Sequence, residues 1–180
     1  MNNGEQSVLE KLESGIRNVP DFPKKGILFK DITPLLKDPD LLTLTRDKLY
    51  EQVKDYDIDY VVGLESRGFI FGPPLALKLG AGFVPVRKPN KLPYDKISQS
   101  YELEYGTDLL EIHADGIPKG ARVLIHDDLI ATGGSAKAAV QLVERLEGNI
   151  VACSFIIELS FLNGRDVLPE GLNIHSILKY

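Results

Sequence analysis

The chain has little cysteine and no long run of apolar residues. Its one cysteine in 180 residues, Cys153, excludes an internal disulfide. Cys153 lies in the apolar run 150–157, where we expect a small buried hydrophobe rather than a nucleophile. No stretch approaches the ~20 apolar residues that cross a bilayer, and the first residues lack the apolar centre of a signal peptide. We therefore expect a cytoplasmic protein.

An excess of positive charge is also missing. The formal net charge is −5, whereas broad binding to nucleic acid or to an acidic membrane needs a surplus of Lys and Arg. An anionic ligand would have to be attracted by a local cluster of cations. Histidine and cysteine show no metal-ligand spacing, and we expect His113 and His175 to be structural.

In other respects the composition is that of an ordinary globular protein. Hydrophobic residues make up 43% and charged residues 26% of the chain. A chain of this length typically forms one domain and buries roughly 70% of the surface that its unfolded form exposes. There is no internal repeat and no low-complexity tract. We predict a single domain over residues 1–180.

Short apolar segments alternate with helical patterns along most of the chain. We predict strands over residues 60–64, 82–86, 109–113, 122–126 and 150–157. We predict helices around residues 8–16, 38–54, 68–80 and 135–147, the second of them with Asp38 as N-cap and Pro39 in the first turn. This alternation indicates an α/β protein with a parallel sheet of about five strands, flanked by helices.

The stretch from Lys88 to about Tyr105 has no clear assignment. It is longer than the ordinary connection of ~4–6 residues and contains several prolines and lysines. A solvated hairpin and an active-site lid are both compatible with it. We favour the lid, because the stretch begins at the carboxyl end of a strand, where ligands of parallel sheets bind.

The strongest local signal is the passage from an apolar strand into the segment 131–135, which we name the anion loop. Gly133 and Gly134 allow the backbone to wrap closely around an anion, and the following helix directs its positive end there. The hydroxyls of Thr132 and Ser135 can donate as well. The loop lacks the lysine of a nucleoside-triphosphate loop, so that motif does not apply.

Two acids, Asp127 and Asp128, precede the anion loop. Carboxylates would repel a bare phosphate, but they suit a vicinal diol, a hydrated Mg²⁺ or positive charge developing on a sugar ring. All three belong to an activated phosphoribosyl group. The alternative is that the two acids merely cap the loop.

The acids and the anion loop together resemble the 5-phosphoribosyl 1-diphosphate motif of the type I phosphoribosyltransferases. Further segments resemble the adenine-specific branch of that family. They are residues 21–32, 63–69, 86–88, 91–93 and 103–106. The Glu-Ser-Arg-Gly-Phe segment from Glu65 and the Leu-Glu-Tyr-Gly segment from Leu103 are the most specific to this branch.

The resemblance implies a role for each part of the activated sugar. The 5-phosphate would be held by Ala131, Thr132, Gly133, Gly134 and Ser135, and the ribose hydroxyls by Asp127 and Asp128. The diphosphate would be surrounded by Ser66, Arg67, Arg87, Lys88 and Lys91, with Mg²⁺ bridging it through water and ligand oxygens. Independently of the resemblance, four cations at strand ends of an acidic protein indicate a local cluster.

The resemblance also implies an adenine site and two catalytic residues. Adenine would lie between a hood formed by residues 1–35, with Ile27, Leu28, Phe29 and Lys30, and Leu129. Glu104 would manage the purine N7 proton, and Tyr105 would lie over the reacting groups. Without the resemblance, we would interpret Glu104 as an exposed carboxylate on a strand and Phe29 as a core residue.

Several finer points follow from the same resemblance. Hypoxanthine-guanine relatives carry a lysine where this chain has residues 155–159 without one, which favours a 6-amino purine. Lys30 stands where arginine is common, and His126 where an apolar residue is usual. His126 reads as a satisfied strand histidine that could also add positive charge beside Asp127. The resemblance also implies a homodimer with Arg67 near its interface. Separately, it implies a cis peptide bond between Glu65 and Ser66.

The resemblance thus implies transfer of a 5-phosphoribosyl group to adenine, giving AMP and diphosphate. One alternative is a non-catalytic regulator that senses the activated sugar. Such proteins usually carry a basic helix-turn-helix, for which the roughly twenty residues before Phe22 leave little room. Another alternative is a relative specific for a different base, such as xanthine.

Overall fold

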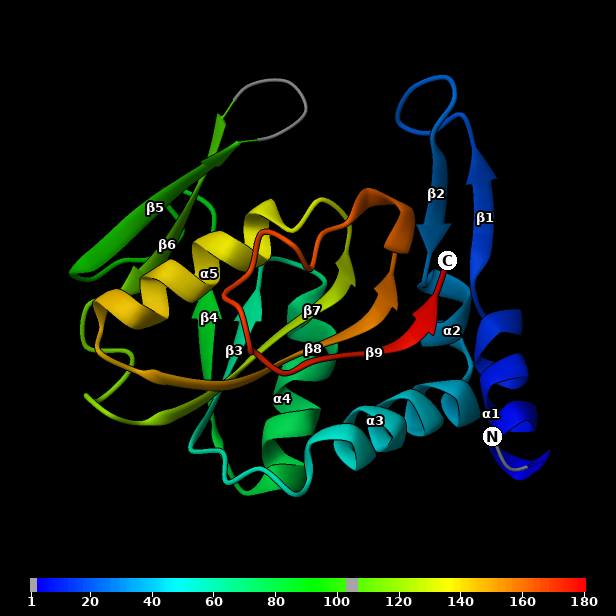
Figure 1. Cartoon of the computed structure of the whole chain (residues 1–180), viewed down its shortest axis with the longest axis horizontal. Helices are drawn as coiled ribbons and strands as arrows, with labels where there is room; N and C mark the ends of the chain where they lie inside the picture. The colour runs from blue at the N-terminus through cyan, green and yellow to red at the C-terminus, as the bar shows by residue number, and fades with distance from the viewer. Residues whose placement is uncertain (1–2, 103–106) are drawn as a thin grey trace. The chain divides into compact units, whose positions relative to one another are not determined.

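The computed structural model describes residues 3–102 and 107–180 (Figure 1). The chain divides into two compact units, Met1–Lys48 and Leu49–Tyr180. Each unit is described by itself below. The single domain with a hood over residues 1–35 stays a prediction.

The first unit is a small β-ribbon with helices. It contains α1 (Asn3–Ser14), β1 (Arg17–Pro20), β2 (Leu28–Asp31), α2 (Thr33–Lys37) and the first part of α3 (Pro39–Val53). β1 and β2 pair antiparallel. The predicted start of α3 is confirmed, because Asp38 Oδ1 accepts hydrogen bonds from the N–H groups of Asp40 and Leu41, both at 2.9 Å.

The second unit is built on a five-stranded parallel sheet in the order β4-β3-β7-β8-β9. The strands are β3 (Tyr60–Leu64), β4 (Gly82–Val86), β7 (Arg122–Ile130), β8 (Asn149–Glu158) and β9 (Ile174–Lys179). The helices α4 (Gly68–Leu79) and α5 (Gly134–Arg145) connect neighbouring strands. A short 3₁₀ helix, η1 (Ser160–Leu162), follows β8. The predicted α/β class and number of sheet strands are confirmed.

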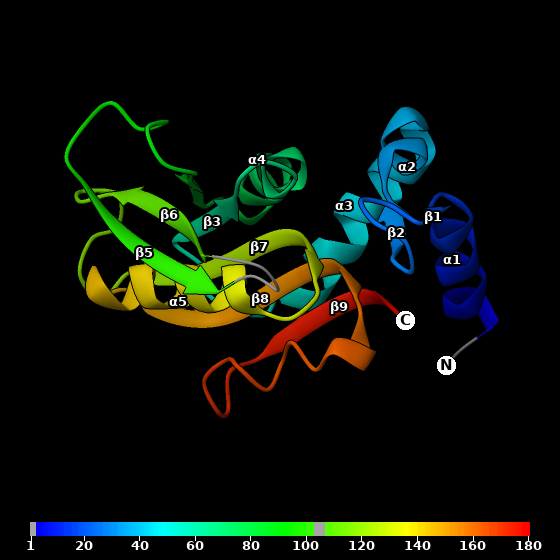
Figure 2. The same cartoon turned by 90° about the horizontal axis from the view of Figure 1, so that it is seen from above.

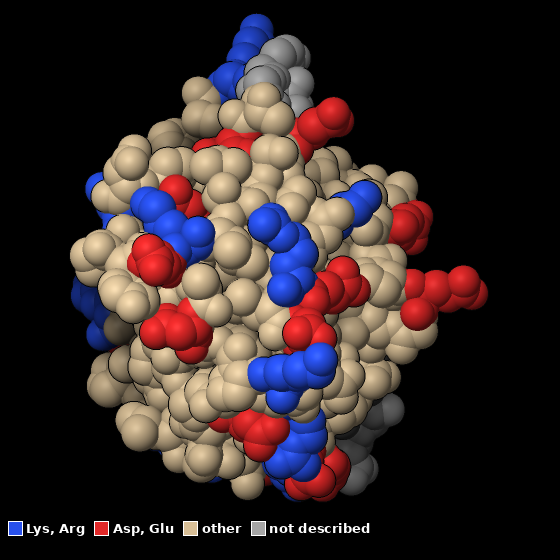
Figure 3. All heavy atoms as spheres, turned by 90° about the vertical axis from the view of Figure 1, so that its left-hand side faces the viewer, with Lys and Arg blue, Asp and Glu red and all other residues tan. Residues whose placement is uncertain are grey.

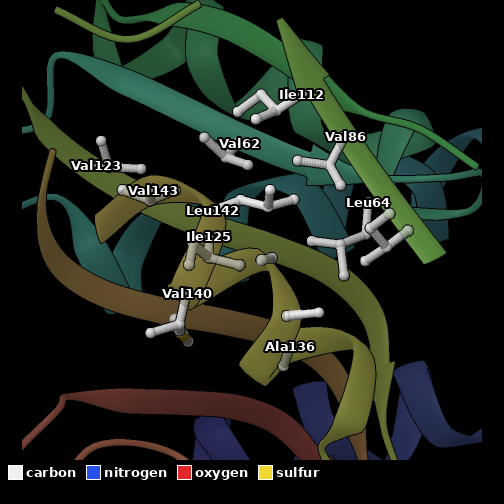
Figure 4. Packing of buried hydrophobic residues seen from close by; sticks show 14 of the residues in the cluster. Val62, Leu64, Val86, Ile112, Val123, Ile125, Ala136, Val140, Leu142 and Val143 are labelled. Atoms are coloured by element: carbon white, nitrogen blue, oxygen red, sulfur yellow. The ribbon is translucent and has the colours of Figure 1, made fainter. Parts of the chain in front are cut away.

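The two connecting helices cover opposite faces of the sheet (Figure 2). On one face, Val62, Leu64 and Ile125 belong to a buried cluster with Ala136 and Val140 of α5 (Figure 4). On the other face, α4 lies so close to the sheet that one position of the helix requires glycine. A methyl group at Gly72 of α4 would lie 2.5 Å from the ring of Phe83 of β4. Because side chains alternate along a strand, β3 contributes to both layers.

One predicted strand lies outside the main sheet. Residues 109–113 belong to β6 (Thr107–His113), which forms an antiparallel hairpin with β5 (Lys96–Glu102). The hairpin meets the sheet region at an isolated antiparallel bridge between Arg87 and Glu111. The stretch after Lys88 therefore contains one arm of a hairpin, which was one of its two interpretations. The favoured interpretation as an active-site lid stays a prediction.

The fifth strand of the sheet is β9, which the sequence did not predict. It is an edge strand, and of its residues Ile177 and Leu178 are buried. Without a continuous apolar run it does not resemble a buried parallel strand. None of the described helices is long and apolar enough to cross a membrane.

Candidate active site

The candidate site lies where the order of the strands reverses. From β3 the chain crosses by α4 to β4 on one side, whereas β7 on the other side of β3 leads by α5 to β8. The loops after β3 and β7 therefore leave in opposite directions from neighbouring strand ends. Open α/β sheets bind ligands in the crevice at such a point.

The anion loop follows β7 directly, as predicted. Gly133 has φ 82° and precedes α5, which begins at Gly134. The N-terminal amides of this helix provide donors for an anion. A cleft of about 560 Å³ adjoins the loop, with Thr132, Gly134 and Lys137 on one side and Tyr101 and Glu102 of β5 on the other.

The two acids lie on β7 itself and not in the loop after it. The strand continues to Ile130 because Asp127 and Leu129 pair with Phe155 and Ile157 of β8. The Asp128 side chain is 3% exposed, and its Oδ2 lies 3.1 Å from Nε of Arg67. Asp127 Oδ1 accepts a hydrogen bond from the N–H of Asp128 at 2.8 Å.

Burial raises the affinity of both acids for protons. Burial raises the pKa of Asp127 well above its ordinary value, and the neighbouring Asp128 raises it further. Burial also raises the pKa of Asp128, although Arg67 works in the opposite direction. A pair of this kind is stabilised by ligand hydroxyls or by a cation, which are the partners expected from the sequence.

His126, the unusual residue before the acids, is fully buried. Its Nδ1 lies 3.0 Å from the backbone carbonyl oxygen of Ser154, and its Nε2 has no hydrogen-bond partner among the described residues. Burial lowers the pKa of His126 to about 4, against a weaker opposite effect of the Ser154 carbonyl. The ring is therefore neutral near pH 7, which argues against the alternative that it adds positive charge beside Asp127. The favoured interpretation as a satisfied strand histidine holds for Nδ1 but not for Nε2.

Three of the expected cations lie just beyond the ends of two strands: Arg67 follows β3, and Arg87 and Lys88 follow β4. The peptide bond Glu65–Ser66 is cis, which confirms that prediction. Arg87 Nε donates to Glu65 Oε2 at 3.0 Å, and the N–H of Lys88 donates to the same oxygen at 2.8 Å. Burial raises the pKa of Glu65, but these hydrogen bonds outweigh it and the net shift is downward.

The third cation, Lys88, forms an ion pair with the β5–β6 hairpin. Lys88 Nζ and the Tyr101 hydroxyl both donate to Asp108 Oδ2, at 3.0 and 3.1 Å. Burial raises the pKa of Tyr101 to about 12, and Asp108 adds to this. The sequence interpretation missed Tyr101 and Asp108, because only the strand register makes them cross-strand partners. Lys91 is exposed, and its charge favours ionised Glu65.

The residues expected to contact adenine fall in both units. In the first unit, Phe29 packs edge-on against Phe22 with ring centroids 5.1 Å apart, and Lys30 Nζ donates to Asn18 Oδ1 at 2.8 Å. Leu28 is exposed and Ile27 half-buried, whereas Leu129 is a half-buried residue of the second unit. Their meeting around one ligand stays a prediction.

The two residues expected to be catalytic, Glu104 and Tyr105, lie outside the described residues. The described residues before them end with β5 at Glu102, and those after them begin with β6 at Thr107.

Residues 3–102 and 107–180 contain no group of three or more His, Cys, Asp or Glu side chains that could hold a metal ion. The face of the molecule in Figure 3 carries acidic and basic side chains interspersed rather than gathered by sign. Cys153 is buried, as expected, and burial raises its pKa to about 12.

Comparison with known proteins places this site in a family. The family model for a phosphoribosyl transferase domain matches residues 32–160. An adenine phosphoribosyltransferase of Halothermothrix orenii is 56% identical over 169 residues, which cover 94% of this chain and 99% of the relative. One from Flavobacterium johnsoniae is 60% identical over 160 residues, covering 89% and 94%.

Solved structures agree with these relatives. The crystal structure of adenine phosphoribosyltransferase from Rhodothermus marinus superposes with a TM-score of 0.92 at 55% identity, covering 97% of this chain and 99% of that one. The enzyme from Saccharomyces cerevisiae, complexed with an imino-altritol bisphosphate and adenine, gives 0.89 at 48% identity, covering 96% and 99%. The chain belongs to the adenine phosphoribosyltransferase family of the type I phosphoribosyltransferases.

Proposed function

We propose that the strand ends around β3 and β7 bind 5-phosphoribosyl 1-diphosphate and that its 5-phosphoribosyl group passes to adenine there. The products are AMP and diphosphate, as in purine salvage. The observation that carries the proposal is the succession of two acids, a loop and a helix N-terminus at the end of β7. Two acids of raised pKa, the half-buried Asp127 and the buried Asp128, lie immediately before a glycine-containing loop at a helix N-terminus. An anion and a polyhydroxylated group fit this arrangement together.

The anion loop is proposed to hold the 5-phosphate through the amides of residues 131–135. Asp127 and Asp128 accept hydrogen bonds from the ribose hydroxyls, which compensates two carboxylates held close together. A hydrated Mg²⁺ carried by the diphosphate fits the same two acids through water and would neutralise charge on the leaving group. The described residues offer no separate ligand cluster for it.

The diphosphate is proposed to bind at the loops after β3 and β4. Ser66 is exposed there, and three of the expected cations lie against carboxylates: Arg67 against Asp128, Arg87 against Glu65 and Lys88 against Asp108. An incoming diphosphate competes with these carboxylates for the cations, and Lys91 adds a further positive charge. This pairing keeps the cations in place before the ligand arrives.

Adenine is proposed to stack on Phe29, with Ile27 and Leu129 beside it and backbone groups of Leu28 and Lys30 along its edge. N9 attacks carbon 1 of the ribose, and the bond from carbon 1 to the diphosphate oxygen breaks with its electron pair. The proton on N7 passes to the carboxylate of Glu104, with Tyr105 above the reacting groups. Positive charge that develops on the sugar ring lies close to Asp127 and Asp128.

A homodimer is proposed on the evidence of α4. This helix carries apolar residues all round, and such a helix is usually covered on every side. Ile70 and Leu77 lie seven residues apart on it and are 37% and 83% exposed. A second copy of the chain is the proposed cover, close to Arg67 at the start of the helix.

The test is a base panel. The purified chain is incubated with 5-phosphoribosyl 1-diphosphate, Mg²⁺ and, in turn, adenine, hypoxanthine, guanine, xanthine and uracil, and nucleotide and diphosphate are quantified. We expect AMP and diphosphate in equal amounts with adenine, and little product with the others.

A preference for another base would refute the adenine assignment. Tight binding of the activated sugar without turnover on any base would refute catalysis and support a regulator.

A further inference from the structure

The anion loop touches a second segment of the chain, residues 159–168, which we name the bracing segment. The contact is between backbones: a methyl group at Gly164 would lie 2.2 Å from the carbonyl oxygen of Ala131, and one at Gly133 would lie 2.2 Å from that of Gly164. Contacts below 3.0 Å are not tolerated, so neither position has room for a side chain. The N–H of Leu159 also donates to the carbonyl of Ile130 at 3.0 Å.

Arg165 fastens the bracing segment to the sheet. Its Nε and Nη2 donate to the two carboxylate oxygens of Glu158 at 2.7 and 2.6 Å, and its Nη1 donates to the carbonyl of Ile174 at 2.9 Å. This guanidinium therefore joins the end of β8 to β9 directly beside Gly164. A bidentate pair of this kind fixes orientation as well as distance.

The pair is partly shielded from water. The Glu158 side chain is 8% exposed and that of Arg165 34%. The hydrogen bonds from Arg165 lower the pKa of Glu158 against the effect of burial, so the acid stays ionised. At the far end of the bracing segment, Leu168 is buried in the core cluster with α5. The segment is thus held on both sides of Gly164.

We propose that Gly164 and Arg165 are positioning residues for the 5-phosphate: Arg165 holds the bracing segment, and Gly164 supports the anion loop in the conformation that binds the phosphate. The proposal rests on the proposed function of that loop. A loop supported before the ligand arrives loses less conformational freedom on binding, which favours affinity. Neither residue contacts the ligand in this scheme.

The test uses two ligands that occupy different parts of the site. Ribose 5-phosphate needs the anion loop, whereas inorganic diphosphate needs the cations after β3 and β4. Gly164→Ala adds only the methyl group that meets Ala131, so it displaces the loop amides that are proposed to donate to the phosphate. We expect the Kd of ribose 5-phosphate, measured by calorimetry, to rise roughly 10- to 100-fold, the usual cost of losing one hydrogen bond to a charged group, with the Kd of diphosphate nearly unchanged.

Arg165 gives an independent second variant. Arg165→Lys keeps the charge but loses the bidentate geometry, and we expect an intermediate loss of ribose 5-phosphate affinity. Arg165→Met should lose more. If Gly164→Ala does not fold, the same comparison of the two ligands is made on Arg165→Lys. Asp166→Ala is the matched control, because Asp166 is an exposed residue of the same segment.

The proposal is overturned if the folded variants bind ribose 5-phosphate like the wild type, or if both ligands weaken equally. Equal weakening would mean a general loss of structure. Failure of the wild-type chain to bind ribose 5-phosphate would instead refute the proposed function of the anion loop, and the inference with it.

Discussion

Replacement of His126 by valine should change how stability depends on pH. The ring is buried, and its folded-state pKa is about 4, against an ordinary value of 6.5. Between these two values the unfolded chain binds a proton that the folded chain does not. His126 therefore makes the wild type less stable as the pH falls from 6.5 towards 4.

The size of the effect follows from the separation of the two pKa values. A full proton of difference corresponds to about 1.4 kcal/mol per pH unit. Because the unfolded histidine titrates over this range, the wild type should lose about 2 kcal/mol relative to His126→Val between pH 7 and pH 5. Asp127 and Asp128 have raised pKa values and act in the opposite direction, so the difference between the two proteins is the quantity to follow.

Urea unfolding of both proteins at several pH values between 5 and 7.5 gives this difference. Cys153→Val is the control, because Cys153 is buried on the neighbouring strand and its pKa of about 12 lies far outside the range. Its stability should stay at a constant offset from the wild type. A difference between wild type and His126→Val that is equal at pH 5 and pH 7 would refute a buried neutral histidine.

Three further outcomes are expected. Glu104→Gln should lower kcat by ~10²–10⁴-fold with little change in the Kd of the activated sugar, measured by steady-state kinetics and calorimetry; near-normal turnover with fast product release would reject its catalytic role. Asp128→Asn should both lower kcat and weaken binding of ribose 5-phosphate, each by about tenfold or more, because the hydroxyls are present before and during reaction; unchanged binding would reject this contact. Leu77→Glu should shift the protein towards monomer in analytical ultracentrifugation, and an undisturbed dimer would place the interface elsewhere.

Local features of the fold and of the site were predictable because they depend on neighbours in the sequence. The N-cap at Asp38 needs only the next few amides, and the anion loop needs glycine where φ is 82° at Gly133. The burial of Cys153 followed from its apolar run. Each of these features is set within a few residues.

Longer-range predictions failed where an element is not marked by its own composition. β9 was missed because it has no continuous apolar run, yet it completes the sheet. Residues 109–113 form a strand as predicted, but this strand pairs with β5 outside the main sheet. A strand's partner depends on which edge is still open once the other strands have paired, and one sequence does not carry that information.

The sequence by itself determined most strands and helices of the α/β sheet region, the anion loop, the acids beside it and the family that they indicate. Tertiary structure alone decided the partners of the charged groups: Arg67 with Asp128, Lys88 with Asp108, and Arg165 with Glu158. It also decided that His126 is neutral, because desolvation depends on what packs around the ring. A motif can be recognised in the sequence because its residues are contiguous. Burial and ion pairing instead arise between segments that only the folded chain brings together.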